Sequence, residues 1–125
     1  MIGKLLAIAF AGSLGTLARY GLAGVAQRFA GGGYPAGTLT VNLAGCFVAG
    51  FLWTLTEGRL SVDGELWAFI FIGFVGAFTT FSTYILETGE MIREGDFILA
   101  AVNMAVQNVG GIAALIAGIA LARML

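Results

Sequence analysis

Four long apolar segments, separated by short glycine-rich or charged breaks, dominate the pattern along the chain. They cover residues 2–29, 35–56, 66–92 and 96–123, and the breaks lie around 31–35, 57–65 and 93–96. Each segment exceeds the roughly 20 apolar residues that a helix needs to cross a membrane. Because the breaks are short, neighbouring helices should be antiparallel. The pattern predicts an all-α integral membrane protein, with four transmembrane helices in a single domain covering residues 1–125.

Composition supports this prediction and excludes several classes of function. Hydrophobic residues make up 59% of the chain and charged residues 10%, with a mean hydropathy of +0.97, whereas soluble domains carry about 25% charged residues. The net charge of −1 argues against a nucleic-acid surface. With no histidine and only Cys46, the chain has no disulfide or metal-ligand set of the usual kind. No nucleophile stands beside a base, so we expect no enzyme, and we expect no cleaved leader.

The basic residues near the helix ends are almost evenly divided between the two sides of the membrane. Lys4, Arg59 and Arg123 fall on one side, and Arg28 and Arg93 on the other. Such a weak bias does not favour one orientation. Insertion in both directions, followed by pairing of two opposed copies into an antiparallel homodimer, is the simplest interpretation. The alternative is one orientation, imposed by other features.

The third segment carries an unusual run of hydroxyl groups, GAFTTFSTY, at residues 76–84. Glycine and β-branched residues are poor helix formers, so a broken helix is plausible, with free carbonyls suited to a cation such as Na⁺. An unbroken helix with hydroxyls bonded to the preceding turn is equally plausible. On a helix, Thr80, Thr83 and Glu87 would form one polar stripe, and Phe81 would lie beside Tyr84.

Five further polar residues lie within the other segments, where lipid disfavours them. Arg19 is about 15 Å from the end of the first segment, deep for snorkelling, which favours a vestibule or ion-pair role. Asn42 could donate to an anion or bridge two helices. Asn103 and Gln107 share one face of the fourth segment and either pack helices together or line a route. Asn108 points to a different face from Gln107, so at most one of these two should share the route of Asn103.

These stretches resemble the Fluc (CrcB-type) fluoride channels. The matching motifs are GSLGTLARYG in the first segment, GTLTVNLAG in the second, and GFVGAFTTFSTY, followed by Glu87, in the third. The resemblance extends along essentially the whole chain and is weakest in the fourth segment. It implies a dual-topology antiparallel homodimer in the cell (inner) membrane, with two pores that export fluoride passively.

The resemblance also implies roles for individual residues. A central structural Na⁺ would be held by the backbone carbonyls of Gly76 and Thr79. The residues implied at the pore are Asn42, Phe81, Tyr84, Asn103 and Gln107, together with the hydroxyls of Thr80, Ser82 and Thr83; Arg19 and Glu87 would serve the vestibule. Tyr84 departs from the phenylalanine usual in the family, and the two carboxamides of the fourth segment depart from its hydroxyl-bearing residues.

A small multidrug-type exporter is the main alternative, because it also has four spans and dual insertion. That mechanism needs a carboxylate deep in the first span, to exchange protons for cations. The first segment has no acidic residue and carries Arg19 instead, which favours an anion path. A purely structural subunit is a third possibility and predicts no ion flux.

Overall fold

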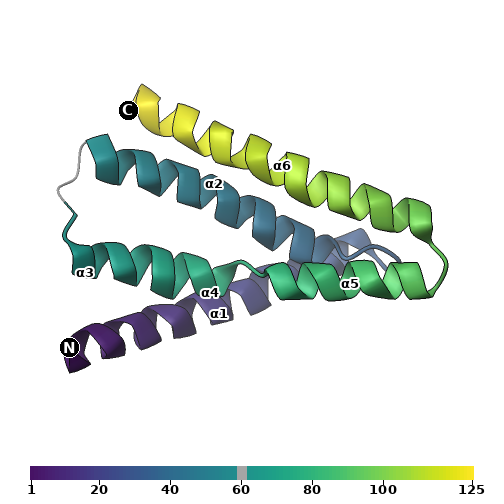
Figure 1. Ribbon diagram of the computed structural model, residues 1–125, viewed down its shortest axis with the longest axis horizontal. Coiled ribbons are helices and arrows are strands. Elements are labelled where there is room, and N and C mark those ends of the chain that lie inside the picture. The colour runs from purple at the N-terminus through teal and green to yellow at the C-terminus, as the bar shows by residue number, and fades with distance from the viewer. Residues whose placement is uncertain (59–61) are drawn as a thin grey trace.

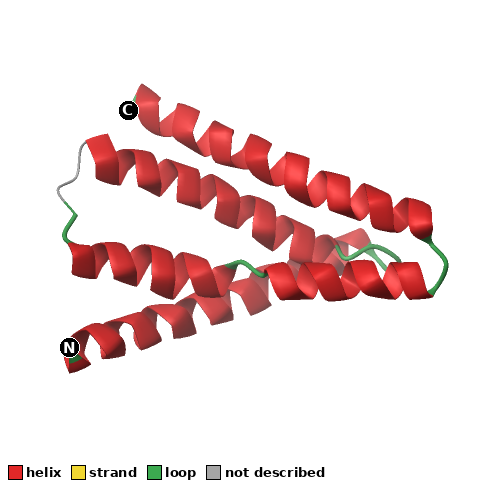
Figure 2. Ribbon diagram, viewed as in Figure 1, coloured by secondary structure: helices red, strands yellow, loops and turns green. Residues whose placement is uncertain are grey.

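The computed structural model describes residues 1–58 and 62–125, and every regular element among them is a helix (Figure 2). In chain order these are α1 (Ile2–Ala30), α2 (Ala36–Gly58), α3 (Gly64–Trp67), η1 (Ala68–Val75), α4 (Gly76–Phe78), α5 (Phe81–Arg93) and α6 (Phe97–Met124). Four stretches, 2–30, 36–57, 64–93 and 97–124, are long and apolar enough to cross a membrane. The four predicted spans are therefore confirmed to within two residues at each end, and the chain is a multi-pass membrane protein.

Consecutive spans run in opposite directions, with both termini at the same end of the bundle (Figure 1). Lys4 and Arg123 lie near that end, and Arg28 and Arg93 lie near the other, in the last turns of α1 and α5. Arg59, which the sequence assigned to the terminal end, lies outside the described residues. The described part of the chain thus has two basic residues near each end, and this balance leaves dual insertion a prediction.

Close backbone contacts hold the spans together in two pairs, α2 with α6 and α1 with the η1–α4 segment. A Cβ atom at Gly118 of α6 would meet the Phe47 carbonyl of α2, and one at Gly15 of α1 would meet the Phe74 carbonyl of η1. Small residues let the two helix backbones approach closely. In lipid the hydrophobic effect does not drive helices together, so van der Waals contact between them stabilises the pairs instead.

The interior of the bundle is unusually polar for so apolar a chain. The fully or nearly buried side chains include four polar ones, Thr38, Thr88, Asn103 and Gln107, and Asn103 has no exposed surface. Large apolar side chains such as Phe29 and Ile98 are instead exposed on the outside of the bundle. The arrangement fits a membrane protein whose lipid-facing surface is apolar and whose polar groups pair inside.

The third span is interrupted at Thr79 and Thr80, between α4 and α5 (Figure 2). Thr79 has φ −84° and ψ 160°, and Thr80 has φ −149° and ψ 114°, so both are extended. Just before the interruption, η1 is a π-helix, in which the Gly76 N–H bonds the Phe71 carbonyl five residues back. Of the two conformations that the sequence allowed, the chain adopts the broken helix. Thr80 accordingly lies outside α5, and only Thr83 and Glu87 of the expected stripe are helical.

Candidate functional site

The interruption at Thr79 and Thr80 is stabilised by its own side chains and by a close neighbour. The Thr80 hydroxyl caps α5 by accepting the Thr83 N–H at 3.3 Å, and it donates to the Thr83 hydroxyl at 3.0 Å. Gly45 of α2 makes room for the extended segment, because a Cβ atom there would collide with the Thr79 methyl group. Thr80 is thus the N-cap residue at which α5 begins.

Asn42 of α2 pairs with both backbone groups of Thr80. Its Oδ1 accepts the Thr80 N–H at 2.9 Å, and its Nδ2 donates to the Thr80 carbonyl at 3.0 Å. The same Nδ2 donates to Gln107 Oε1 on α6 at 3.1 Å. We call the two bonds to Thr80 the Asn42–Thr80 pair; the bond to the Thr80 N–H satisfies the peptide group that the broken helix leaves without a helical partner.

The two carbonyls predicted to hold a cation are those whose helical donors go elsewhere. In a continuous α-helix the Thr80 N–H would bond the Gly76 carbonyl, and the Thr83 N–H would bond the Thr79 carbonyl. Here the first donor bonds Asn42 and the second bonds the Thr80 hydroxyl. The break therefore removes the normal hydrogen-bond donor from both carbonyls, which is the state in which unwound helices present oxygen ligands to Na⁺.

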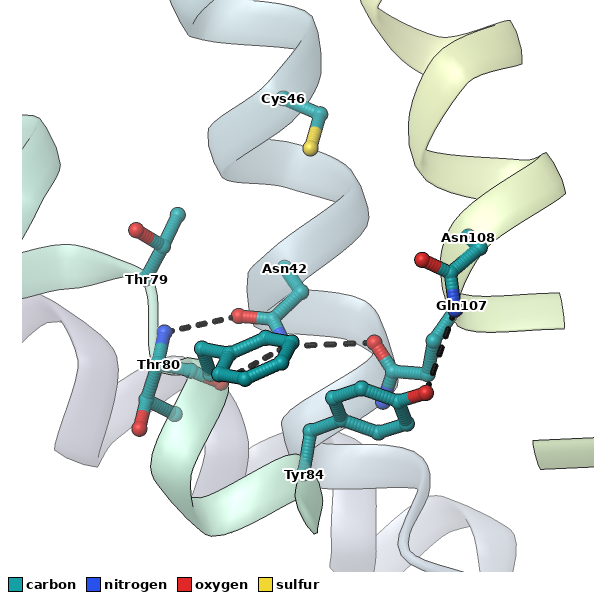
Figure 3. A pocket seen from close by; sticks show the side chains of 8 residues that line it. Asn42, Cys46, Thr79, Thr80, Tyr84, Gln107 and Asn108 are labelled. Carbon is teal, nitrogen blue, oxygen red and sulfur yellow. Dashed lines mark hydrogen bonds between the residues drawn. The ribbon is translucent and has the colours of Figure 1, made fainter. Parts of the chain in front are cut away.

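A cavity of about 220 Å³ lies beside the interruption, between α2, α5 and α6 (Figure 3). Its lining is uncharged and consists of Asn42, Cys46, Thr79, Thr80, Phe81, Tyr84, Gln107 and Asn108. The side chains of Asn42, Gln107 and Tyr84 point toward one another around it (Figure 3). The cavity brings together five residues implied at the pore, which the sequence placed on three different spans: Asn42, Thr80, Phe81, Tyr84 and Gln107.

Two hydrogen-bond donors at this cavity have no acceptor in the described chain. Gln107 is 8% exposed; its Oε1 accepts a hydrogen from Asn42, and its Nε2 is buried without a partner in that part of the chain. The Tyr84 hydroxyl accepts the Asn108 Nδ2 at 3.2 Å, which leaves its own hydrogen free to donate. The Phe81 ring meets Tyr84 edge-on, with centroids 5.5 Å apart at 66°, as the i, i+3 spacing predicted.

Asn103 lies away from this cavity, in a second cluster that joins the first loop to α5. Its Oδ1 accepts the Tyr34 hydroxyl at 2.9 Å, and its Nδ2 donates to the Thr88 hydroxyl at 2.9 Å. Thr88 in turn donates to the Tyr84 carbonyl at 2.8 Å. Burial raises the pKa of Tyr34, and the charge of Glu87 raises it further, so the hydroxyl is a neutral donor near pH 7. In this structure Asn103 therefore connects helices within the chain, and its pore role stays a prediction.

Glu87 and Arg19 lie at two other cavities. Glu87 accepts the Thr38 hydroxyl at 2.6 Å through Oε1, and its Oε2 is buried without a partner in the described residues. It borders a cavity of about 440 Å³ that also holds Tyr34 and two further acids. Half-buried Arg19 borders one of about 310 Å³, whose lining includes Thr16, Thr38, Thr80 and Thr83. Polar groups thus border cavities on both sides of Thr80.

Some contacts at the site were not apparent from the sequence. We expected Gln107 and Asn108 on different faces of α6, yet both border the first cavity. Asn108 does so because its amide donates to the Tyr84 hydroxyl of α5. Tyr34, which the sequence placed in a break, reaches Asn103 in α6. Ser82 is exposed and lies 3.5 Å from the Thr80 hydroxyl, so it takes little part in the first cavity. The only sequence signal for these contacts was an excess of buried polar residues.

Comparison with known proteins gives a consistent result. Residues 6–119 match the family described as CrcB-like protein, Camphor Resistance (CrcB). A protein of Desulforapulum autotrophicum, named fluoride-specific ion channel FluC, is 55% identical over 98% of both chains. Proteins with the same name from Solidesulfovibrio magneticus and Nitrosococcus oceani are 42% and 41% identical, over 100% and 98% of both chains respectively.

Proposed function

Because this chain belongs to the CrcB-like family of ion channels, we propose that it is a fluoride-selective channel, which lets fluoride leave the cell passively across the inner membrane. The observation that carries the proposal is the uncharged cavity beside the broken third span, with its two unpaired donors on Gln107 and Tyr84. The names of the relatives support fluoride as the ion, and the cavity supports an anion path that uses hydrogen-bond donors.

The chemistry of the cavity suits a small, strongly hydrated anion. Moving a bare ion from water into an apolar environment is prohibitive unless other donors replace its water. Gln107 Nε2 offers two hydrogens and the Tyr84 hydroxyl one, while the edge of the Phe81 ring carries partial positive charge. No lysine or arginine of residues 1–58 and 62–125 borders the cavity, and the absence of a fixed positive charge favours binding that is weak enough for the ion to leave, as conduction requires.

Asn42 and the threonine hydroxyls would complete the path. Both Asn42 amide hydrogens are already bonded, so a passing anion would take the one now given to Gln107 Oε1, while the bonds to Thr80 remain. The hydroxyls of Ser82 and Thr83 lie along the start of α5 and would offer further donors as the ion leaves the amides. The Thr80 hydrogen is given to the Thr83 hydroxyl and would have to leave it to reach the ion. Arg19, on the other side of Thr80, would raise the local anion concentration from its vestibule.

A structural Na⁺ fits the carbonyls of Gly76 and Thr79, because the break diverts the donors of both. Two carbonyl oxygens are too few for a sodium ion, so the site requires the same pair from a second copy. When bound, the ion would supply a fixed positive charge near the pore and hold the two broken helices together. Exposed Gly76 is accessible to such a partner.

An antiparallel homodimer in the lipid bilayer is the assembly that we propose for this chain. The Phe81 side chain is 73% exposed although it borders the first cavity, so one wall of each pore is missing until a partner covers it. The even distribution of basic residues at the two ends permits opposed insertion. A two-fold pair would contain two equivalent cavities and hence two pores.

The small multidrug-type exporter is the alternative function, but the carboxylate that its mechanism requires is not found in α1 or among the described residues at the first cavity. Residues 2–30 of α1 contain no carboxylate, and the first cavity contains no acid that could exchange protons for a cation. Half-buried Glu87, in α5, accepts the hydroxyl of Thr38 in α2. An exporter of this type predicts cation-coupled proton flux, which a channel lacks.

The deciding experiment is fluoride efflux from liposomes that contain the purified protein, with chloride as the competing anion. We expect fluoride flux without chloride flux, and a decrease of about ten-fold or more in Gln107→Leu, because one lost donor to a charged group weakens binding by about 1.5–3 kcal/mol. Thr54→Val is the matched control, since that hydroxyl bonds Gly50 of its own helix and should not affect flux. Folded protein that passes no fluoride, or passes chloride equally well, would refute the proposal.

A further inference from the structure

Asn42 uses both of its amide hydrogens and its carbonyl oxygen in hydrogen bonds inside the chain. A carboxamide offers two hydrogens and a carbonyl oxygen, and here one hydrogen bonds the Thr80 carbonyl, the other bonds Gln107 Oε1, and the oxygen accepts the Thr80 N–H. Three bonds of 2.9–3.1 Å fix both the position and the orientation of the amide. A side chain that served the ion alone would leave at least one hydrogen free.

The Asn42–Thr80 pair competes directly with helix formation. The Thr80 N–H has two possible acceptors, Asn42 Oδ1 or the Gly76 carbonyl of a continuous helix. In a membrane, peptide groups that lose a helical partner need another one, because no water replaces it. Asn42 supplies that partner to the Thr80 N–H from a different helix, 38 positions away in the sequence, and also bonds the Thr80 carbonyl. The broken conformation is therefore stabilised by a residue outside the third span.

We infer that Asn42 is a positioning residue for the cation site: by accepting the Thr80 N–H, it keeps the Gly76 carbonyl available as a ligand. Gln107 supports this role by accepting the second amide hydrogen, which prevents the Asn42 amide from rotating. The inference rests on the cation site of the proposed function and extends it, because the same amide borders the anion cavity. The pore and the cation site thus share one side chain.

The test measures sodium binding through stability, independently of flux. Thermal unfolding of the full chain in detergent is compared in sodium chloride and in N-methylglucamine chloride at equal ionic strength. We expect the wild-type protein to unfold about 4 °C or more higher in sodium. Asn42→Ala should lose at least half of this shift, because the Thr80 N–H can return to Gly76. Asn42→Asp keeps an oxygen for the Thr80 N–H and should retain the shift.

Thr54→Val is the matched control, since that hydroxyl bonds Gly50 of its own helix and lies outside both the Asn42–Thr80 pair and the cavity; it should keep both the sodium shift and the fluoride flux. A full shift in Asn42→Ala, or no shift in Asn42→Asp, would overturn the inference. If Asn42→Ala does not fold, Asn42→Asp decides alone. A wild-type protein without any sodium shift would also overturn it, while intact fluoride efflux would leave the channel proposal standing.

Discussion

Replacing Asn103 by leucine separates a helix-connecting role from a pore role. Asn103 has no exposed surface, borders none of the three cavities described above, and bonds Tyr34 and Thr88. Leucine is similar in volume and apolar, so the substitution removes hydrogen bonds and leaves no large void. We expect Asn103→Leu to destabilise the chain and to leave fluoride flux within about two-fold of the wild type, a change of under 0.5 kcal/mol in the barrier.

The magnitude follows from the two lost bonds. A side-chain hydrogen bond contributes about 1 kcal/mol net, and bonds between membrane helices average about 0.6 kcal/mol. Losing both predicts a decrease of about 1–2 kcal/mol in the free energy of unfolding. Tyr34→Phe removes only the first bond and should cost about half as much. In the double variant the two effects should not add, with a coupling of about 0.6–1 kcal/mol.

The assay is unfolding in mixed micelles by titration with sodium dodecyl sulfate, followed through the fluorescence of Trp53 and Trp67, beside fluoride efflux from liposomes. Stability and flux are measured on the same preparations of wild type, Asn103→Leu, Tyr34→Phe and the double variant. A ten-fold loss of flux in Asn103→Leu, with unfolding unchanged, would show instead that this carboxamide lies in the ion path.

Three further outcomes follow from the structure. Phe81→Ile should decrease fluoride flux by about ten-fold or more, because it removes the ring edge. The free energy of unfolding should change little, since the side chain is 73% exposed. Unchanged flux would show that the ring serves only packing. Gly118→Ala should lower the free energy of unfolding by about 1–3 kcal/mol, because the added Cβ atom meets the Phe47 carbonyl. Gly24→Ala is the control: no atom lies within 4 Å of its added Cβ, so the same unfolding titration should show an unchanged or higher stability. The raised pKa of Tyr34 means that its stabilisation is present below pH 10.0 and is lost as pH rises through the raised value; Tyr34→Phe should abolish that alkaline loss, and an identical alkaline profile in the variant would contradict the assignment.

The number, length and type of the elements followed from hydropathy. An unbroken apolar segment of membrane length can only be a helix, because lipid offers no partner for free peptide groups, so the spans were predictable to within two residues. The choice between a broken and a continuous third span was not predictable. It depends on whether Thr80 finds an alternative partner, and that partner, Asn42, lies on a different helix.

The local sequence therefore determined that this chain crosses the membrane four times and carries polar side chains at membrane depth; it could not say which of those side chains meet. Asn103 and Gln107 are one turn apart on the same face of α6, yet one bonds a loop tyrosine and the other borders the cavity beside the break. The difference arises from which neighbouring helix lies opposite each turn. Hydropathy depends on each residue alone, whereas a hydrogen bond between helices depends on the positions of both partners, and only packing in three dimensions provides those.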